Sequence, residues 1–244
     1  MITLIGTGHV FDLSQALLDI FEEKQPDVLC VELDKQRYGA LMLKQSDPEK
    51  YAEQSKNLPI IYKMLAKFQD NMAKDYGVQA GQEMITTIQY AQSRQLPLAF
   101  IDMDAKRLFT RMLKSMSFRE KIRMLFSGFA GFFVSKKRVE KELDKLEDNF
   151  DKYMDEIGKK FPTIKRVLVD ERNQYMVQQL VSATEQYSKI IAVVGDGHIP
   201  GLSDLLKKEK LEFETIRLKE IRNKKIETDD ASTASFSLSY TEVK

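Results

Sequence analysis

The chain has 244 residues, of which 43% are hydrophobic and 31% are charged, so it is long enough to form one domain with a sizeable insertion. Its 38 Lys and Arg residues nearly balance its 37 Asp and Glu residues, which argues against a nucleic-acid partner that needs a strongly basic surface. The single cysteine, Cys30, excludes an internal disulfide and a cysteine-rich zinc site. Because it lies in the apolar run Val28-Leu29-Cys30-Val31, we expect a buried structural thiol rather than a nucleophile.

Membrane and export signals are not visible in the sequence. No window approaches the ~20 consecutive apolar residues of a transmembrane helix. Polar and glycine residues at Gly6, His9 and Asp12 interrupt the apolar start, unlike the hydrophobic stretch of a signal peptide. The sequence therefore predicts a cytoplasmic protein with no integral membrane segment.

The first hundred residues alternate short apolar runs with segments of helical periodicity. The predicted elements are a strand at 2–5, a helix at 12–24, a strand at 28–33, helices between 34 and 95, and a strand at 96–102. A strand, a helix and a strand within 33 residues form a βαβ unit, so we expect these two strands to be parallel with a right-handed crossover.

The second half continues this alternation after a long helical stretch. Its predicted elements are helices over 105–158, two helices separated at Asp170, a strand at 190–194, a helix at 201–210 and an edge strand at 211–218. The predicted fold class is α/β, with a central, mostly parallel sheet flanked by helices and a helical insertion or cap at about 105–158. This domain spans 1–222, and a polar tail occupies 223–244. Met and Phe side chains within 118–134 are a candidate homodimer face.

Both histidines of the chain end a Gly-x-x-His turn that directly follows a predicted strand. The two turns are Gly6-Thr7-Gly8-His9 and Gly195-Asp196-Gly197-His198. Functional groups of an open parallel sheet gather at the carboxyl ends of its strands, where glycine permits tight turns. A histidine in a loop is most often a surface residue, and Gly-x-Gly alone is a weak phosphate-loop signal. The repeated placement of the only two histidines nevertheless favours one shared functional site.

Carboxylates also stand at the ends of predicted strands. Glu32 closes the second strand and Asp102 closes the third, and a carboxylate there needs a paired cation or a bound metal. For Glu32 the alternatives are a metal ligand or an ion pair with Arg37 or Arg172. For Asp102 and Asp104 the alternative is capping of the following helix, which we favour for Asp104. Two imidazoles with one or two carboxylates suit a divalent transition metal.

Five motifs follow one another over nearly the whole chain. They are Leu4-Ile5-Gly6-Thr7-Gly8-His9, Val31-Glu32-Leu33-Asp34 with Arg37-Tyr38, Gly81 with Glu83, Asp170-Glu171-Arg172-Asn173 with Met176, and Val194-Gly195-Asp196-Gly197-His198-Ile199-Pro200-Gly201. In this order they resemble the TraB/PrgY family, which is similar to the Tiki and GumN proteins. The resemblance implies an α/β domain whose active site is built from paired Gly-x-x-His turns and a glutamate.

The resemblance also implies activities and site residues. The Tiki relatives cleave peptides with a divalent metal, manganese or cobalt being favoured, and TraB and PrgY shut down a peptide pheromone by degradation or sequestration. Carried over by position, the resemblance implies metal ligands at His9, His198 and Glu32, and catalytic positions at Glu32, Glu83, Arg172 and Asn173. The chain departs from the family pattern at Met103, where an arginine is usual, and shows no hydrophobic C-terminal membrane region.

The leading hypothesis is a metal-dependent hydrolase, a peptidase, in which His9, His198 and one glutamate hold manganese, cobalt or zinc. The other glutamate of the Glu32 and Glu83 pair is then the general base, and Arg172 stabilises an oxyanion or a substrate carboxylate. The alternative is a protein that binds or sequesters a peptide or small molecule without chemistry. A nucleotide site at the glycine turns is disfavoured, because Asp196 repels phosphate and no P-loop lysine follows.

Overall fold

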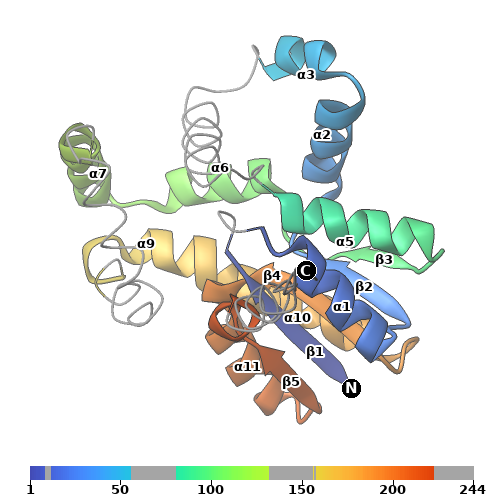
Figure 1. Cartoon of the computed structure of the whole chain (residues 1–244). Helices are drawn as coiled ribbons and strands as arrows, with labels where there is room; N and C mark the ends of the chain where they lie inside the picture. Colours follow the sequence, from blue (N-terminus) through green and yellow to red (C-terminus); the bar gives the residue numbers. More distant parts are fainter. Residues whose placement is uncertain (9–11, 56–80, 132–155, 157, 223–244) are drawn as a thin grey trace, which may run out of the picture.

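The structure is a computed structural model that describes residues 1–8, 12–55, 81–131, 156 and 158–222 (Figure 1). His9, the predicted tail at 223–244 and the part of the predicted insertion after residue 131, apart from 156 and 158, lie outside the described residues. The boundaries of the predicted domain stay a prediction.

A five-stranded sheet forms the centre of the molecule, with the strand order β3-β2-β4-β1-β5 and every neighbouring pair parallel. Its strands are β1 (Ile2–Thr7), β2 (Val28–Val31), β3 (Leu98–Phe100), β4 (Ile190–Gly195) and β5 (Phe213–Ile216). The predicted α/β class, the parallel β1 and β2 and the edge position of β5 are confirmed. The register that aligns Thr7 with Gly195 brings the carboxyl ends of β1 and β4 together.

Helices connect the strands and cover both sides of the sheet. They are α1 (Ser14–Lys24), α2 (Lys35–Ser46), α3 (Pro48–Ser55), α5 (Gln82–Ser93), α6 (Ala105–Ser115), α7 (Phe118–Gly131), α9 (Pro162–Lys165), α10 (Glu171–Thr184) and α11 (Ile199–Lys208). Figure 1 shows the strands between α1 and α5 on one side and α10 and α11 on the other.

The two-residue period of the strands divides the core between these two layers. On β4, Ile191 and Val193 pack into the cluster that includes α1 and α5, whereas Ala192 and Val194 pack into the cluster that includes α10 and α11. Cys30 belongs to the second cluster and is fully buried. This position confirms the predicted buried thiol, and burial raises its pKa to about 12.

Two predicted helix boundaries are wrong. Asp170 does not separate two helices, because the backbone stays helical through a π turn at Arg166–Asp170 and continues directly into α10. The helix predicted to begin at residue 201 begins at Ile199, because a 3-10 turn over Asp196–His198 leads straight into it. Proline is tolerated in the first turn of α11, where its missing N–H has no intrahelical partner.

The described part of the predicted helical insertion consists of α6 and α7, which pack with α9 and the π turn around Leu108, Met112, Met116 and Val167. Glu120 anchors this group. Its carboxylate closes a capping box with Ser117 and accepts the Thr163 N–H at 2.8 Å.

Helix α7 lies within the segment predicted to form the homodimer face. Phe118 is 77% exposed and Ile122 is 40% exposed at the start of this helix. The homodimer stays a prediction. None of the described helices is long and apolar enough to cross a bilayer.

Candidate active site

Glu32 stands at the centre of a charged cluster at the carboxyl edge of the sheet. It directly follows β2, is only 7% exposed, and its Oε2 accepts the Gly195 N–H at 2.6 Å from the end of β4. Because residues alternate along a strand, Glu32 lies on the same face as Cys30, the face that α10 and α11 cover. Two neighbouring strands and two helices therefore fix the position of this carboxylate.

Arg172, in the first turn of α10, compensates the negative charge of Glu32. Its Nη2 donates to Glu32 Oε1, and its Nη2 and Nε donate to Asp102 at 2.7 and 2.9 Å. Burial opposes the charge of Arg172, but the two carboxylates raise its pKa above the ordinary value. Of the two ion pairs considered for Glu32, the structure forms the one with Arg172. Arg37 instead donates to Asp102.

The aspartates after β3 have different roles. Asp104 caps α6 by accepting the Arg107 N–H at 2.7 Å, which confirms the predicted cap. Asp102 caps no helix; it is 4% exposed, bridges Arg172 and Arg37, and accepts the Met103 N–H at 2.7 Å. Asp102 therefore extends the charged cluster from β2 to the end of β3.

Asp34 and Arg37 are two further members of this network, although the sequence indicated no site role for Asp34 and only a candidate ion pair with Glu32 for Arg37. Asp34 caps α2 by accepting the Arg37 N–H at 2.9 Å, binds the Arg37 Nε at 2.7 Å, and accepts the Ala105 N–H at 3.2 Å. Burial acts to raise the pKa of Asp34, but the bonds from Arg37 outweigh it and lower the pKa. An aspartate directly before a predicted helix was the available signal.

His198 lies against the same cluster and is 8% exposed. Its Nδ1 is 2.6 Å from Asn173 Oδ1, and its Nε2 is 3.4 Å from Glu32 Oε1. An amide oxygen only accepts, so Nδ1 donates its proton to Asn173, and Nε2 is the ring nitrogen that faces the carboxylate. Gly201 makes room for this arrangement, because a Cβ there would lie 2.2 Å from Asn173 Nδ2.

The second glycine turn packs tightly on the end of β1. A Cβ on Gly6 would lie 2.1 Å from Asp196 Oδ1, so only glycine fits between β1 and this turn. Arg217 holds the Asp196 carboxylate with two bonds at 2.8 and 2.6 Å. His9 is outside the described residues, and its convergence with His198 stays a prediction.

Of the predicted site residues that the structure describes, Glu83 is the one that lies outside the network of contacts around Glu32. It is 2% exposed in the first turn of α5, which packs on the other face of the sheet from α10 and α11. Thr86, one turn further, donates to Ser14 at 3.1 Å, so this end of α5 lies beside the start of α1. The role of Glu83 stays a prediction.

One question about the cluster is which of its donor atoms could hold a metal ion. Within the described residues, no group of three or more His, Cys, Asp or Glu side chains gathers as a metal site. Two donor atoms do face one another, the Nε2 of His198 and the Oε1 of Glu32. The structure thus joins Glu32, Arg172, Asn173 and His198 in one chain of contacts at the sheet edge.

Comparison with known proteins identifies the family of this chain. The model of the TraB/PrgY/gumN family matches residues 1–215. Uncharacterized protein MJ1365 of Methanocaldococcus jannaschii is 32% identical over 220 residues, which cover 85% of this chain and 53% of that protein. The human TraB domain-containing protein is 24% identical over 232 residues, which cover 82% of this chain and 61% of that protein. The chain thus spans between 53% and 61% of these relatives, and it belongs to the TraB/PrgY/gumN family.

Proposed function

We propose that this protein hydrolyses an amide bond in a peptide, using a divalent metal ion held at the carboxyl edge of the sheet. The observation that carries the proposal is the orientation of His198. Asn173 lies 2.6 Å from one ring nitrogen, and the other nitrogen faces Glu32 at 3.4 Å. A hydrogen bond that fixes one ring nitrogen while the other is presented to a site is typical of metal-binding and catalytic histidines.

The spacing of the two donor atoms supports a metal ion. In a tetrahedral site with bonds of about 2.0–2.2 Å, neighbouring donor atoms lie about 3.3–3.6 Å apart. The 3.4 Å between His198 Nε2 and Glu32 Oε1 falls in this range. In the neutral ring both atoms present lone pairs, so a cation beside them relieves their repulsion. The family resemblance favours manganese or cobalt, and imidazole with carboxylate also suits zinc.

The remaining ligand and the base are assigned from the resemblance. We assign His9 as the further protein ligand, because its Gly-x-x-His turn follows β1, next to β4 in the sheet. Glu83 is then the general base, and Glu32 is a ligand. A bound divalent ion lowers the pKa of its water and polarises the scissile carbonyl.

The hydrogen bonds of Arg172 define what it contributes. A guanidinium has five N–H donors, and Arg172 uses them on Glu32, twice on Asp102 and on the Leu168 carbonyl oxygen. One N–H of Nη1 has no acceptor among the described residues, and we assign it to a substrate oxyanion or carboxylate. The main role of Arg172 in this proposal is to hold Glu32 in place while keeping its charge balanced.

Peptide cleavage tests the proposal. We expect the full chain to cleave members of a peptide library with manganese, cobalt or zinc, and to retain metal in elemental analysis after purification. His198→Ala and Glu32→Gln should each lower turnover by about 100-fold or more. Glu23→Gln, which removes an exposed carboxylate from α1, is the matched control and should keep full turnover. Full turnover by folded His198→Ala would refute the proposal.

A second candidate function is peptide or small-ligand binding without chemistry. It is favoured by the ion pair between Glu32 and Arg172, which already neutralises the carboxylate without a metal. Purified protein without metal, an unchanged melting temperature on addition of manganese, and peptide binding without cleavage would together select this function.

A further inference from the structure

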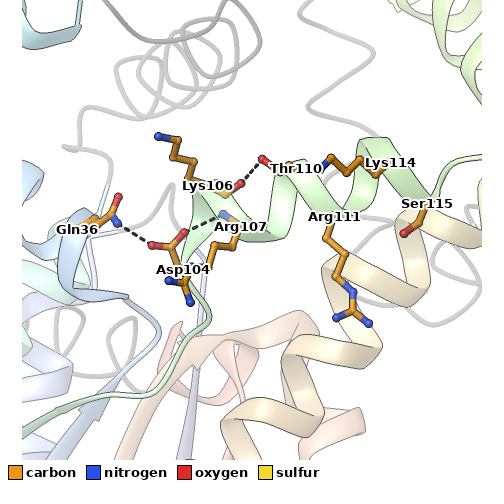
Figure 2. Close-up of a pocket in the computed structure, with 8 residues that line it drawn as sticks. All are labelled: Gln36, Asp104, Lys106, Arg107, Thr110, Arg111, Lys114 and Ser115. Atoms are coloured by element: carbon orange, nitrogen blue, oxygen red, sulfur yellow. Dashed lines mark hydrogen bonds between the residues drawn. The ribbon is translucent and has the colours of Figure 1, made fainter.

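A pocket of about 610 Å³ lies along α6, separate from the histidine and glutamate of the cluster. Gln36 lies in the first turn of α2, Asp104 caps α6, and the other lining residues lie on α6 (Figure 2). The lining residues are Gln36, Asp104, Lys106, Arg107, Thr110, Arg111, Lys114 and Ser115.

The pocket is strongly cationic. Lys106, Arg107, Arg111 and Lys114 line it, and Asp104 is the one acidic lining residue. Both carboxylate oxygens of Asp104 are engaged, since Oδ1 accepts the Arg107 N–H at 2.7 Å and Oδ2 accepts the Gln36 amide at 2.8 Å. Asp104 therefore caps the helix and forms no ion pair with a described lysine, and its one negative charge stands against four positive charges in the pocket.

Three of the four cations form no ion pair with the described part of the chain. Arg111 binds Glu171 at 3.0 Å, and Figure 2 shows its guanidinium turned away from Lys106 and Lys114. Lys106, Arg107 and Lys114 are exposed and have no carboxylate partner among the described residues. Unpaired cations of one sign in a concave surface attract anions by their summed field.

The pocket adjoins the cluster through three pairs of neighbouring residues. Gln36 of the pocket is next to Arg37, and Asp104 is two residues from Asp102, both of which belong to the charged network. On the far side, Arg111 pairs with Glu171, which directly precedes Arg172. A ligand in the pocket therefore lies next to the cluster and can extend toward it.

The spread of the charges indicates the shape of the ligand. Lys106 and Lys114 are separated by eight residues of helix, which is about 12 Å at 1.5 Å per residue. An extended peptide rises about 3.3 Å per residue, so two acidic side chains four positions apart lie on the same side at about 13 Å, close to this separation.

We propose that the α6 pocket binds an acidic segment of a peptide, whose Asp and Glu carboxylates pair with Lys106, Arg107 and Lys114. The proposal rests on the proposed function in one respect, namely that the same peptide then presents its scissile amide at His198. It names the substrate class of that site, peptides with acidic residues beside the cleaved bond.

The test measures binding of fluorescent decapeptides to the full chain by anisotropy. We expect a peptide with alternating Glu to bind, its Gln counterpart to bind at least tenfold more weakly, and the affinity to fall as salt rises. Lys106→Gln with Lys114→Gln should weaken binding about three- to tenfold. Lys207→Gln with Lys208→Gln removes two exposed lysines from α11 and should change binding less than twofold.

Several outcomes would overturn the pocket proposal. They are equal binding of the Glu and Gln peptides, no effect of the α6 double variant, or displacement of the peptide by inorganic phosphate at micromolar concentration, which would make the pocket a phosphate site.

Cleavage separates the two proposals. If acidic peptides bind through the α6 lysines but no metal supports cleavage, the hydrolase proposal fails and the pocket stands. If peptides are cleaved without preference for acidic residues, the hydrolase stands and the pocket proposal fails. If both hold, the α6 double variant should raise KM and leave kcat nearly unchanged.

Discussion

The charged cluster at the sheet edge and the pocket on α6 contain the same kinds of side chains in opposite situations. Arg172 is 14% exposed at its side chain and is bonded to two buried carboxylates, whereas Lys106 and Lys114 are exposed and have no such partner in the part of the chain that the structure describes. Buried charges must be paired within the protein, and exposed unpaired charges remain available to a ligand. The comparison predicts that changes in the cluster cost stability and that changes in the pocket cost binding.

The largest effect is expected for Arg172→Leu, which leaves Glu32 and Asp102 buried without this cation. We expect the free energy of unfolding in urea to fall by about 3–5 kcal/mol. Arg94→Leu is the matched control, since Arg94 pairs with Glu22 and both side chains are more than half exposed. It should cost less than about 1 kcal/mol. If Arg172→Leu and Arg94→Leu lose similar amounts of unfolding free energy, the contrast between buried and exposed charges is contradicted.

The next effect is expected for Gly201→Ala. The new Cβ would meet Asn173 Nδ2 at 2.2 Å, so Asn173 or α11 must move. We expect a loss of about 1–3 kcal/mol in urea unfolding. Peptide cleavage should also fall, because Asn173 orients the His198 ring. Gly39→Ala is the control, as nothing lies within 4 Å of its Cβ position. Unchanged cleavage in Gly201→Ala would show that Asn173 does not position His198.

Glu120 provides an intermediate case, a buried carboxylate paired with hydrogen-bond donors rather than a cation. Burial acts to raise its pKa, but bonds from Thr163 and Ser117 lower it from 4.5 to about 2. Because the folded-state pKa is depressed, the contribution to stability is present above pH 4.5 and is lost as the pH falls through 2. Glu120→Gln should cost about 1–2 kcal/mol at neutral pH.

The pH dependence of that variant isolates Glu120 from the other acidic groups. The difference in melting temperature between the wild type and Glu120→Gln should shrink as the pH falls from 6 to about 2. A difference that stays constant over this range would contradict the depressed pKa.

The smallest effect on stability is expected for Lys106→Gln combined with Lys114→Gln. Neither side chain has an ion-pair partner in the described residues, so unfolding in urea should change by less than about 0.5 kcal/mol. A loss of 2 kcal/mol or more would show that these lysines stabilise the fold and would remove the contrast with Arg172.

Much of the fold could be predicted because burial leaves a periodic trace in the sequence. The strands at Ile2–Thr7 and Ile190–Gly195 and the helix at Ser14–Lys24 lie where the apolar pattern placed them. The position of β4 between β1 and β2 could not be predicted, because it depends on pairing between residues far apart in the chain. The break expected at Asp170 failed because an aspartate is tolerated in the π turn that continues into α10.

The candidate site was predictable to a similar extent. Strand ends and the family resemblance indicated Glu32, Arg172, Asn173 and His198, and these four residues are joined by contacts. Which arginine pairs with Glu32 could not be decided, since Arg172 lies 140 residues away. The α6 pocket was not predicted either, because it requires knowing which lysines lack a carboxylate partner in three dimensions.

The orientation of His198 is the central claim, and ¹⁵N spectroscopy of the histidine rings tests it most directly. The chain has two histidines, so the signals that disappear in His198→Gln identify this ring. We predict that Nδ1 keeps its proton and that the Nε2 signal moves to a metal-coordinated position on addition of zinc. An Nε2 signal that does not respond to zinc would contradict the account.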